Sequence, residues 1–198
     1  TAYHILVASS PELLEQGKGD IWDSGKIESD ASQWITYQGK TLKCNASYYW
    51  KVKIDTNKGA TNWSAPAFWT TGLFNEADWQ GQWIGLDRAA PGDSETQWSR
   101  LAARYLRKEF AVKKDVKRAT VHIAGMGLYE LFINGQRIGN QVLAPAPTDY
   151  RKTILYNTYD VTSLLQTENA IGVTLGNGRF YTMRQNYKPY KIPTFGYP

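Results

Sequence analysis

The chain has 198 residues, enough for one large domain or for two of ordinary size that each bury a core. Apolar residues make up 42% of it, with 8 Trp and 13 Tyr, and this globular composition with excess aromatics favours β-sheets. The net charge of +5 is scattered, and its only local cluster, Lys113-Lys114 with Lys117-Arg118, is expected in a loop, which argues against a nucleic-acid-binding protein.

A single cysteine, Cys44, excludes an internal disulfide, so the core and hydrogen bonds alone must hold the fold. The sequence has no apolar run of about eighteen residues and no basic-then-apolar leader, so we expect neither a membrane span nor a retained signal peptide. It starts at Thr1 without an initiator Met and ends at Pro198. We therefore expect a segment of a longer protein, whose signal peptide could be lost with the front end.

The N-terminal part predicts a small antiparallel sandwich. Residues 2–8 have the pattern of a strand packed on both faces, and residues 10–17 combine a Ser cap, a Pro at the first helical position and a final Gly, which indicates one helical turn. Alternation in the strand predicted from 47–54 places Tyr48, Trp50, Val52 and Ile54 on one face, with Trp50 as the core tryptophan. Further strands separated by turn residues are predicted at 22–25, 34–37 and 67–71.

The second part begins after a predicted junction at 74–82. Residues 127–139 predict a tight β-hairpin, because Asn134-Gly135 tolerates the positive φ angles of a two-residue type I′ turn. A helical turn with Asp160 as its cap is expected over 160–165, and a loop over 87–96. The other strands are predicted at 83–85, 105–110, 119–124 and 171–175.

Four motifs in this part carry a resemblance to a known family. They are GLYELFINGQRIG (127–139), LAPAPTDY (143–150), LYNTYDVT (155–162) and NAIGVTLGNG (169–178). In this order they resemble the jelly-roll domain that precedes the catalytic domain in bacterial α-L-rhamnosidases of glycoside hydrolase family 78. Upstream, residues 2–10, 22–26, 49–53 and 63–72 are similar to the fibronectin-III-like domain at the start of the same enzymes.

The resemblance implies an all-β chain. It would consist of a fibronectin-III/immunoglobulin-like sandwich over 1–73, the junction over 74–82, and a jelly roll over 83–198 that is partial, since the family's domain continues beyond the position of Pro198. It also implies a parent enzyme that hydrolyses terminal L-rhamnose from plant glycans or glycosides with inversion, periplasmic or secreted, with the cytoplasm left open. The catalytic carboxylates would lie in a downstream (α/α)6 barrel, so we expect no catalytic residue here.

Candidate ligand-binding residues lie in the motifs. Sugar modules stack rings on aromatic faces and bond hydroxyls to amides, carboxylates or Arg. The residues of these types form one candidate sugar site: Tyr129, Glu130, Asp149, Tyr150, Asn177, Arg179 and Tyr181. The alternatives are a turn role for Asp149, binding nearby backbone amides, and a solvent-facing strand position for Glu130.

The resemblance also implies a possible calcium site, because some jelly rolls of this family bind rhamnose together with calcium. Asp149 and Asn177 would be its oxygen ligands in this chain. However, Pro147 stands where the family commonly has a Trp that could stack on sugar, which favours a spacer role.

The remaining signals are expected to be structural. His4 and His122 lie in strand patterns and, with one cysteine, offer no zinc spacing. The glycines at 125–127 and 176–178 precede neither a long helix nor a Lys-Ser/Thr pair, so strand-end turns are expected there. Two other functions stay open: a non-catalytic carbohydrate-binding or adhesion protein, and a protein-interaction module that uses exposed aromatics. We expect no nucleic-acid or membrane partner.

Overall fold

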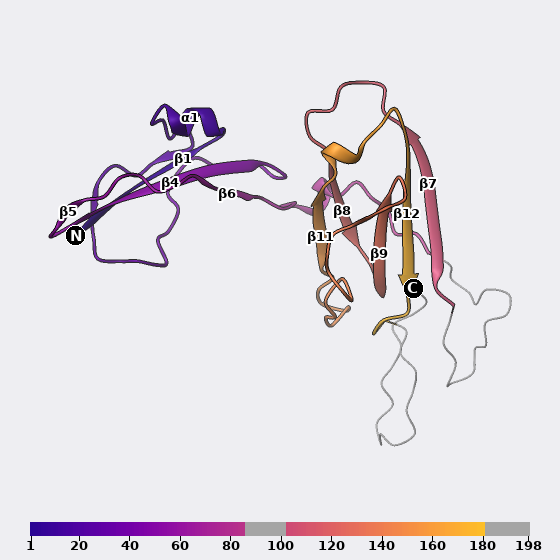
Figure 1. Ribbon diagram of the computed structural model, residues 1–198. Helices are drawn as coiled ribbons and strands as arrows, with labels where there is room; N and C mark the ends of the chain where they lie inside the picture. Colours follow the sequence, from indigo (N-terminus) through magenta and orange to yellow (C-terminus); the bar gives the residue numbers. More distant parts are fainter. Residues whose placement is uncertain (86–101, 181–198) are drawn as a thin grey trace, which may run out of the picture. The chain divides into compact units, whose positions relative to one another are not determined.

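The computed structural model describes residues 1–85 and 102–180, and its chain divides into two units, Thr1–Gly81 and Gln82–Pro198 (Figure 1). Antiparallel sheets dominate both units, as expected for an all-β protein. Among the described residues, the only α-helix is α1 (Pro11–Glu15), and no helix is long and apolar enough to cross a membrane.

The first unit is built on one six-stranded sheet whose two central strands are β1 (Ala2–Ala8) and β4 (Ser47–Thr56). The short strands β2 (Trp22–Asp23) and β3 (Ile27–Glu28) pair with β1, while β5 (Gly59–Ala60) and β6 (Ala67–Thr70) pair with β4. A single 3-10 turn, η1 (Glu76–Asp78), ends the unit.

Strand β1 is buried on both faces, which confirms the prediction from its sequence. On one face Leu6 and Ala8 pack against Leu14 of α1, and all three are almost fully buried. The helix forms where expected: the Ser10 hydroxyl accepts a hydrogen bond from the Leu13 amide at 3.4 Å. Gly17 stands just after the helix with a φ of +73°, a conformation that glycine adopts without strain.

The opposite face of the first sheet carries the aromatic side chains. Tyr48 is 4% exposed, and the half-buried Trp50 and Val52 share its face as predicted, whereas Ile54, on the same strand, is 47% exposed. The strand predicted at 34–37 is not formed. Trp34 has a φ of +60° and a side chain that is 91% exposed, so its backbone leaves the extended region and cannot join a ladder.

The second unit is a sandwich of two sheets (Figure 1). The larger sheet has the order β10-β9-β12-β7, with β7 (Arg104–Ala111), β9 (Leu128–Ile133), β10 (Gln136–Ile138) and β12 (Glu168–Gly176). The smaller sheet pairs β8 (Thr120–Ala124) with β11 (Tyr156–Asp160). Leu131 and Leu175 of the larger sheet pack with Val121, Ile123 and Tyr159 of the smaller one, so the core lies between the two sheets.

The β9–β10 hairpin forms as predicted, with Asn134 at a φ of +51° and Gly135 at +82°. The side chain of Asn134 also reaches beyond the hairpin. Its Nδ2 group donates to the Leu164 carbonyl at 2.9 Å and to Asn169 Oδ1 at 3.0 Å, while its Oδ1 accepts from the Ala170 amide at 2.8 Å. This side chain therefore ties the hairpin turn to the end of η2 and to the start of β12.

Two other local predictions can be compared with the structure. The expected helical turn is present as η2 (Thr162–Leu164), but its N-cap is Val161 and not the predicted Asp160. Asp160 lies one residue earlier, where its Oδ1 accepts from the Thr162 amide at 2.9 Å. The strand predicted at 83–85 is absent, with Trp83 59% and Ile84 72% exposed, since no neighbouring strand in the described part of the chain pairs with this apolar run. The predicted loop at 87–96 lies outside the described residues.

Candidate functional site

The predicted sugar site is not assembled as one surface, because Tyr129 and Glu130 point to opposite faces of β9. Tyr129 lies in the core, 5% exposed, and its hydroxyl accepts a hydrogen bond from Asn157 Nδ2 at 2.7 Å. Burial raises the pKa of Tyr129, and the neighbouring Tyr159 raises it further. Glu130 is exposed and accepts from Arg137 Nε at 3.1 Å, which agrees with the solvent-facing alternative. A sugar ring therefore has no access to Tyr129.

Asp149 acts as a turn residue. Its carboxylate accepts from Arg151 Nε at 3.0 Å, from Nη2 at 3.1 Å and from the Arg151 amide at 3.2 Å. The pKa of Asp149 is lowered, chiefly because Arg151 donates to the carboxylate. A calcium ion at Asp149 would have to compete with the bidentate ion pair between this carboxylate and the Arg151 guanidinium. Among the described residues, no group of three or more His, Cys, Asp or Glu side chains is placed to hold a metal.

Tyr150, another member of the predicted site, packs against Phe180. The Tyr150 ring meets the buried Phe180 ring edge-on, with 5.4 Å between the ring centroids. Burial raises the pKa of Tyr150, and the positive charge of Arg179 partly offsets this shift. Asn177 is half-buried, and Tyr181 lies outside the described residues.

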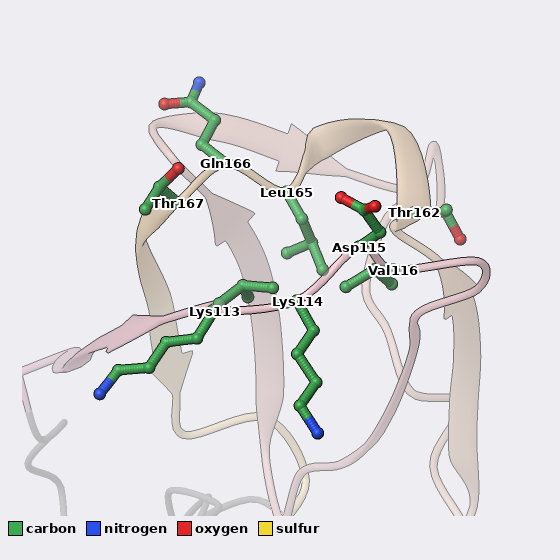
Figure 2. Close-up of a pocket in the computed structure, with 9 residues that line it drawn as sticks. Lys113, Lys114, Asp115, Val116, Thr162, Leu165, Gln166 and Thr167 are labelled. Atoms are coloured by element: carbon green, nitrogen blue, oxygen red, sulfur yellow. The ribbon is translucent and has the colours of Figure 1, made fainter.

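A separate hollow of about 780 Å³ lies between two loops of the second unit (Figure 2). One wall comes from residues 112–116, between β7 and β8, and the other from Thr162 and residues 165–167, before β12. Its size is typical of ligand sites, and loops on a rigid scaffold commonly carry binding residues. Residues distant in sequence form this hollow, so the sequence does not predict it. The only part of its lining that stands out in the sequence is Lys113-Lys114, which is expected in a solvated loop.

The two walls of the hollow are held by hydrogen bonds. The Val112 amide donates to the Thr167 carbonyl at 2.8 Å and joins the two walls directly. Behind the second wall, Asn169 is 5% exposed and exchanges two hydrogen bonds with the backbone of Gln166, at 2.8 and 2.6 Å. The Thr162 hydroxyl accepts from the Ala119 amide at 2.8 Å. The hollow is therefore a preformed feature of the fold.

The lining of the hollow combines charged, polar and apolar groups. Lys113 and Lys114 have no ion-pair partner within residues 1–85 and 102–180, and neither has Asp115. Figure 2 shows both ammonium groups on one side of the loop and the Asp115 carboxylate on the other. The remaining lining consists of hydroxyl, amide and apolar side chains, from Thr162, Gln166, Thr167, Val112, Val116 and Leu165.

The first unit has a hollow of about 480 Å³ with different chemistry. Its lining is almost entirely apolar: Ile5, Val7, Trp22, Tyr37, Leu42, Trp50 and Trp69. These residues belong to the aromatic core face of the sheet. The hollow thus offers few groups that could bond the hydroxyls of a sugar.

Comparison with known proteins identifies both units. Residues 1–75 match the Rha78A-like N-terminal immunoglobulin domain, and residues 114–196 match the alpha-L-rhamnosidase N-terminal domain. The chain is 40% identical, over 95% of its length, to an alpha-L-rhamnosidase of Formosa agariphila, and 36% identical, over 90%, to one of Alteromonas sp..

Solved structures give the same result. The structure of alpha-L-rhamnosidase from Dictyoglumus thermophilum matches 91% of this chain with a TM-score of 0.81 and 42% identity. The alpha-L-rhamnosidase of Aspergillus terreus matches 98% of it with a TM-score of 0.81 and 32% identity. The chain spans only 20 or 21% of the length of each of these four proteins. The chain belongs to the N-terminal domains of the α-L-rhamnosidase family, with an immunoglobulin-like domain followed by an α-L-rhamnosidase N-terminal domain.

Proposed function

We propose that the chain forms the non-catalytic β-domains that precede the catalytic domain of an α-L-rhamnosidase, an inverting enzyme that releases terminal L-rhamnose from plant glycans or glycosides. The observation that carries the proposal is the alignment of 95% of this chain with a fifth of a protein named for that activity. The two units would support a downstream (α/α)6 barrel.

The electrostatics of the carboxyl groups support a non-catalytic role. Inverting glycoside hydrolysis needs a general acid, whose pKa is raised, and a general base across the sugar. Every carboxyl group with a resolved shift in residues 1–85 and 102–180 has a lowered pKa instead. Hydrogen bonds to amides, hydroxyls or basic groups favour the ionised form in each, so these groups are poor proton donors at neutral pH.

A domain exchange tests the proposal. The corresponding domains of the Dictyoglumus thermophilum enzyme would be replaced by this chain, and the chimera compared with the intact enzyme and with a form lacking the domains. We expect the chimera to hydrolyse an aryl α-L-rhamnoside and to survive heating better than the truncated form, while the chain alone shows no hydrolysis. Hydrolysis by the chain alone, or a folded but inactive chimera, would overturn the proposal.

Sugar binding by the second unit would rest on Tyr150 and Arg179, two predicted site residues of which the second exerts its positive charge on the phenol of the first. An aromatic face beside a guanidinium is a common way to hold a sugar ring and its hydroxyls. Calorimetric titration with L-rhamnose, with and without calcium, tests this role. Calcium-dependent heat that disappears in Tyr150→Ala would support recognition, and no heat at millimolar sugar would leave a structural role.

A further inference from the structure

The hollow of about 480 Å³ in the first unit, which we call the aromatic hollow, lies between the sheet and the segment that connects β3 to β4 (Figure 1). It is on the face of the sheet opposite to the one that α1 covers. Its size is within the range of ligand pockets. The aromatic side chains that line it are only half-buried and so keep accessible surface: Trp22, Tyr37, Trp50 and Trp69.

The pairing of the strands builds a slot in the floor of the aromatic hollow. Val7 of β1 lies opposite Trp22 of β2 on one side and opposite Trp50 of β4 on the other. Residues paired in this way point to the same face of a sheet, so an indole stands on each side of a small side chain. Neighbouring strands are about 4.8 Å apart, which separates the two tryptophan backbones by about 10 Å. Val7, 2% exposed, forms the bottom of the slot, with Ile5 beside it.

The connecting segment forms the opposite wall and is fixed in place. The Tyr37 ring meets the Trp22 ring edge-on, with 5.3 Å between the ring centroids. The Tyr37 hydroxyl donates to the Lys40 carbonyl at 2.6 Å, and the Lys40 amide donates to the Ile21 carbonyl at 2.9 Å. Leu42 completes this wall. These contacts tie the segment to the start of β2, so the aromatic hollow is preformed.

The chemistry of the lining selects the kind of ligand. All seven lining side chains are aliphatic or aromatic, and none of them carries a charge at neutral pH. The hydroxyl of Tyr37 already donates to a backbone carbonyl, so the hydroxyls of a sugar would find few partners here. Apolar space of this kind is poorly hydrated and takes up aromatic molecules in preference to water. Indole and phenol rings also attract a further ring by stacking or by edge-to-face contact.

We propose that the aromatic hollow binds a planar aromatic ring of a small organic molecule, held between Trp22 and Trp50 over Val7. A flat ring contacts both indoles through its π-system, whereas a puckered saturated ring makes only apolar contacts. Such a ring occurs in free phenols and in glycosides whose sugar is attached to an aromatic aglycone, and both sources share the part that is recognised. This binding does not require hydrolysis, so it goes beyond the proposed function.

Calorimetric titration of the full chain tests the proposal with three probes: β-naphthol, its saturated analogue decahydronaphthol, and β-naphthyl α-L-rhamnoside. We expect β-naphthol to bind, and the saturated analogue to bind about tenfold more weakly because it loses the aromatic contacts. Binding of the rhamnoside as well would support a ring linked to sugar, and its exclusion would support a free phenol.

A filling variant locates the site. Leu42→Trp adds an indole to the wall of the aromatic hollow, and Ile54→Trp is the matched control, because Ile54 is exposed on β4 and does not line the hollow. We expect the dissociation constant of β-naphthol to rise at least about tenfold in Leu42→Trp and to change less than about twofold in the control. Trp22→Leu removes one side of the slot from a short edge strand and should also weaken binding about tenfold, which tests the site even if Leu42→Trp fails to fold.

Three results of the titrations would overturn the proposal: no heat with β-naphthol, equal binding of decahydronaphthol, or equal weakening in Ile54→Trp. Dimerisation of the chain that Leu42→Trp abolishes, measured by analytical ultracentrifugation, would also overturn it, because the aromatic hollow would then be a contact between two copies. None of these results changes the hydrolysis expected of the chimera, so the two proposals fail separately.

Discussion

The hydroxyl of Tyr129 gives a stability prediction whose sign depends on pH. This hydroxyl lies between the two sheets of the second unit, where it accepts from Asn157 Nδ2 at 2.7 Å. In Tyr129→Phe that bond is lost, but Asn157 keeps the Tyr159 hydroxyl as an acceptor at 3.1 Å. At neutral pH we therefore expect the variant to lose about 0.5–1.5 kcal/mol, the range for one net hydrogen bond.

At alkaline pH we expect the opposite, with Tyr129→Phe more stable than the wild type. Because burial raises the pKa of Tyr129 in the folded protein, the folded state favours the protonated phenol. That contribution is complete below the unfolded-state pKa of about 10, and it is lost as the pH rises toward the folded-state pKa. The wild type should therefore lose about 1.4 kcal/mol per pH unit above about pH 10 through this group, and the variant should not. The two free energies of unfolding should cross near about pH 11.

Urea unfolding followed by circular dichroism at neutral and alkaline pH measures this crossing. Tyr105→Phe is the matched control, because its ring is 81% exposed, and we expect little change in stability from it at either pH. A difference between wild type and Tyr129→Phe that stays constant across the pH range would refute the reasoning, since the buried phenol would then ionise as readily as in the unfolded chain.

Three further predictions address stability elsewhere. Leu14→Ala should cost the first unit about 2–5 kcal/mol, since the side chain is fully buried, and a smaller loss in urea titration would mean that the helix packs loosely. The pKa of Asp23 is lowered, chiefly by the Gly25 amide and also by His4, so the stability that this carboxylate contributes should be lost as the pH falls through its folded-state pKa. In Asp23→Asn, the urea midpoint should therefore depend less on pH on the acid side. A pH profile of the urea midpoint that is the same as in the wild type would contradict this. Gly135→Ala should cost about 1–2 kcal/mol through its left-handed φ alone, because the space that its new Cβ would occupy is open. Gly127→Ala should destabilise far more, because its new Cβ would lie within 2.2 Å of the Gly176 carbonyl oxygen. Equal melting temperatures for the two variants would refute the steric argument.

Local patterns predicted those elements whose signals lie close together in the sequence. The hairpin at Asn134-Gly135 is one example, because two residues determine its turn and alternation determines its strands. The apolar runs at 34–37 and 83–85 looked like strands equally well, but a strand also needs a partner, and neither run finds one among the described residues.

The site was harder to predict than the fold. Tyr129 and Glu130 are neighbours in the chain, yet successive side chains of a strand point to opposite faces, so the pair could not line one surface. The hollow is formed where residues 112–116 lie opposite residues 165–167, and no local sequence pattern predicts that these two segments are neighbours. Its only sequence signal was the pair of lysines, which is indistinguishable from an ordinary solvated turn until the opposite wall is known.

The side chain of Asn134 makes the hairpin turn part of a longer network of hydrogen bonds. It holds the Leu164 carbonyl and Asn169, and Asn169 in turn holds the backbone of Gln166 at the hollow. Anyone who grafts a new turn onto this hairpin, or chooses it as an insertion point for a tag, would therefore alter a loop that contains none of the exchanged residues. In protein engineering the hairpin tip and the hollow should be treated as a single module and transferred together.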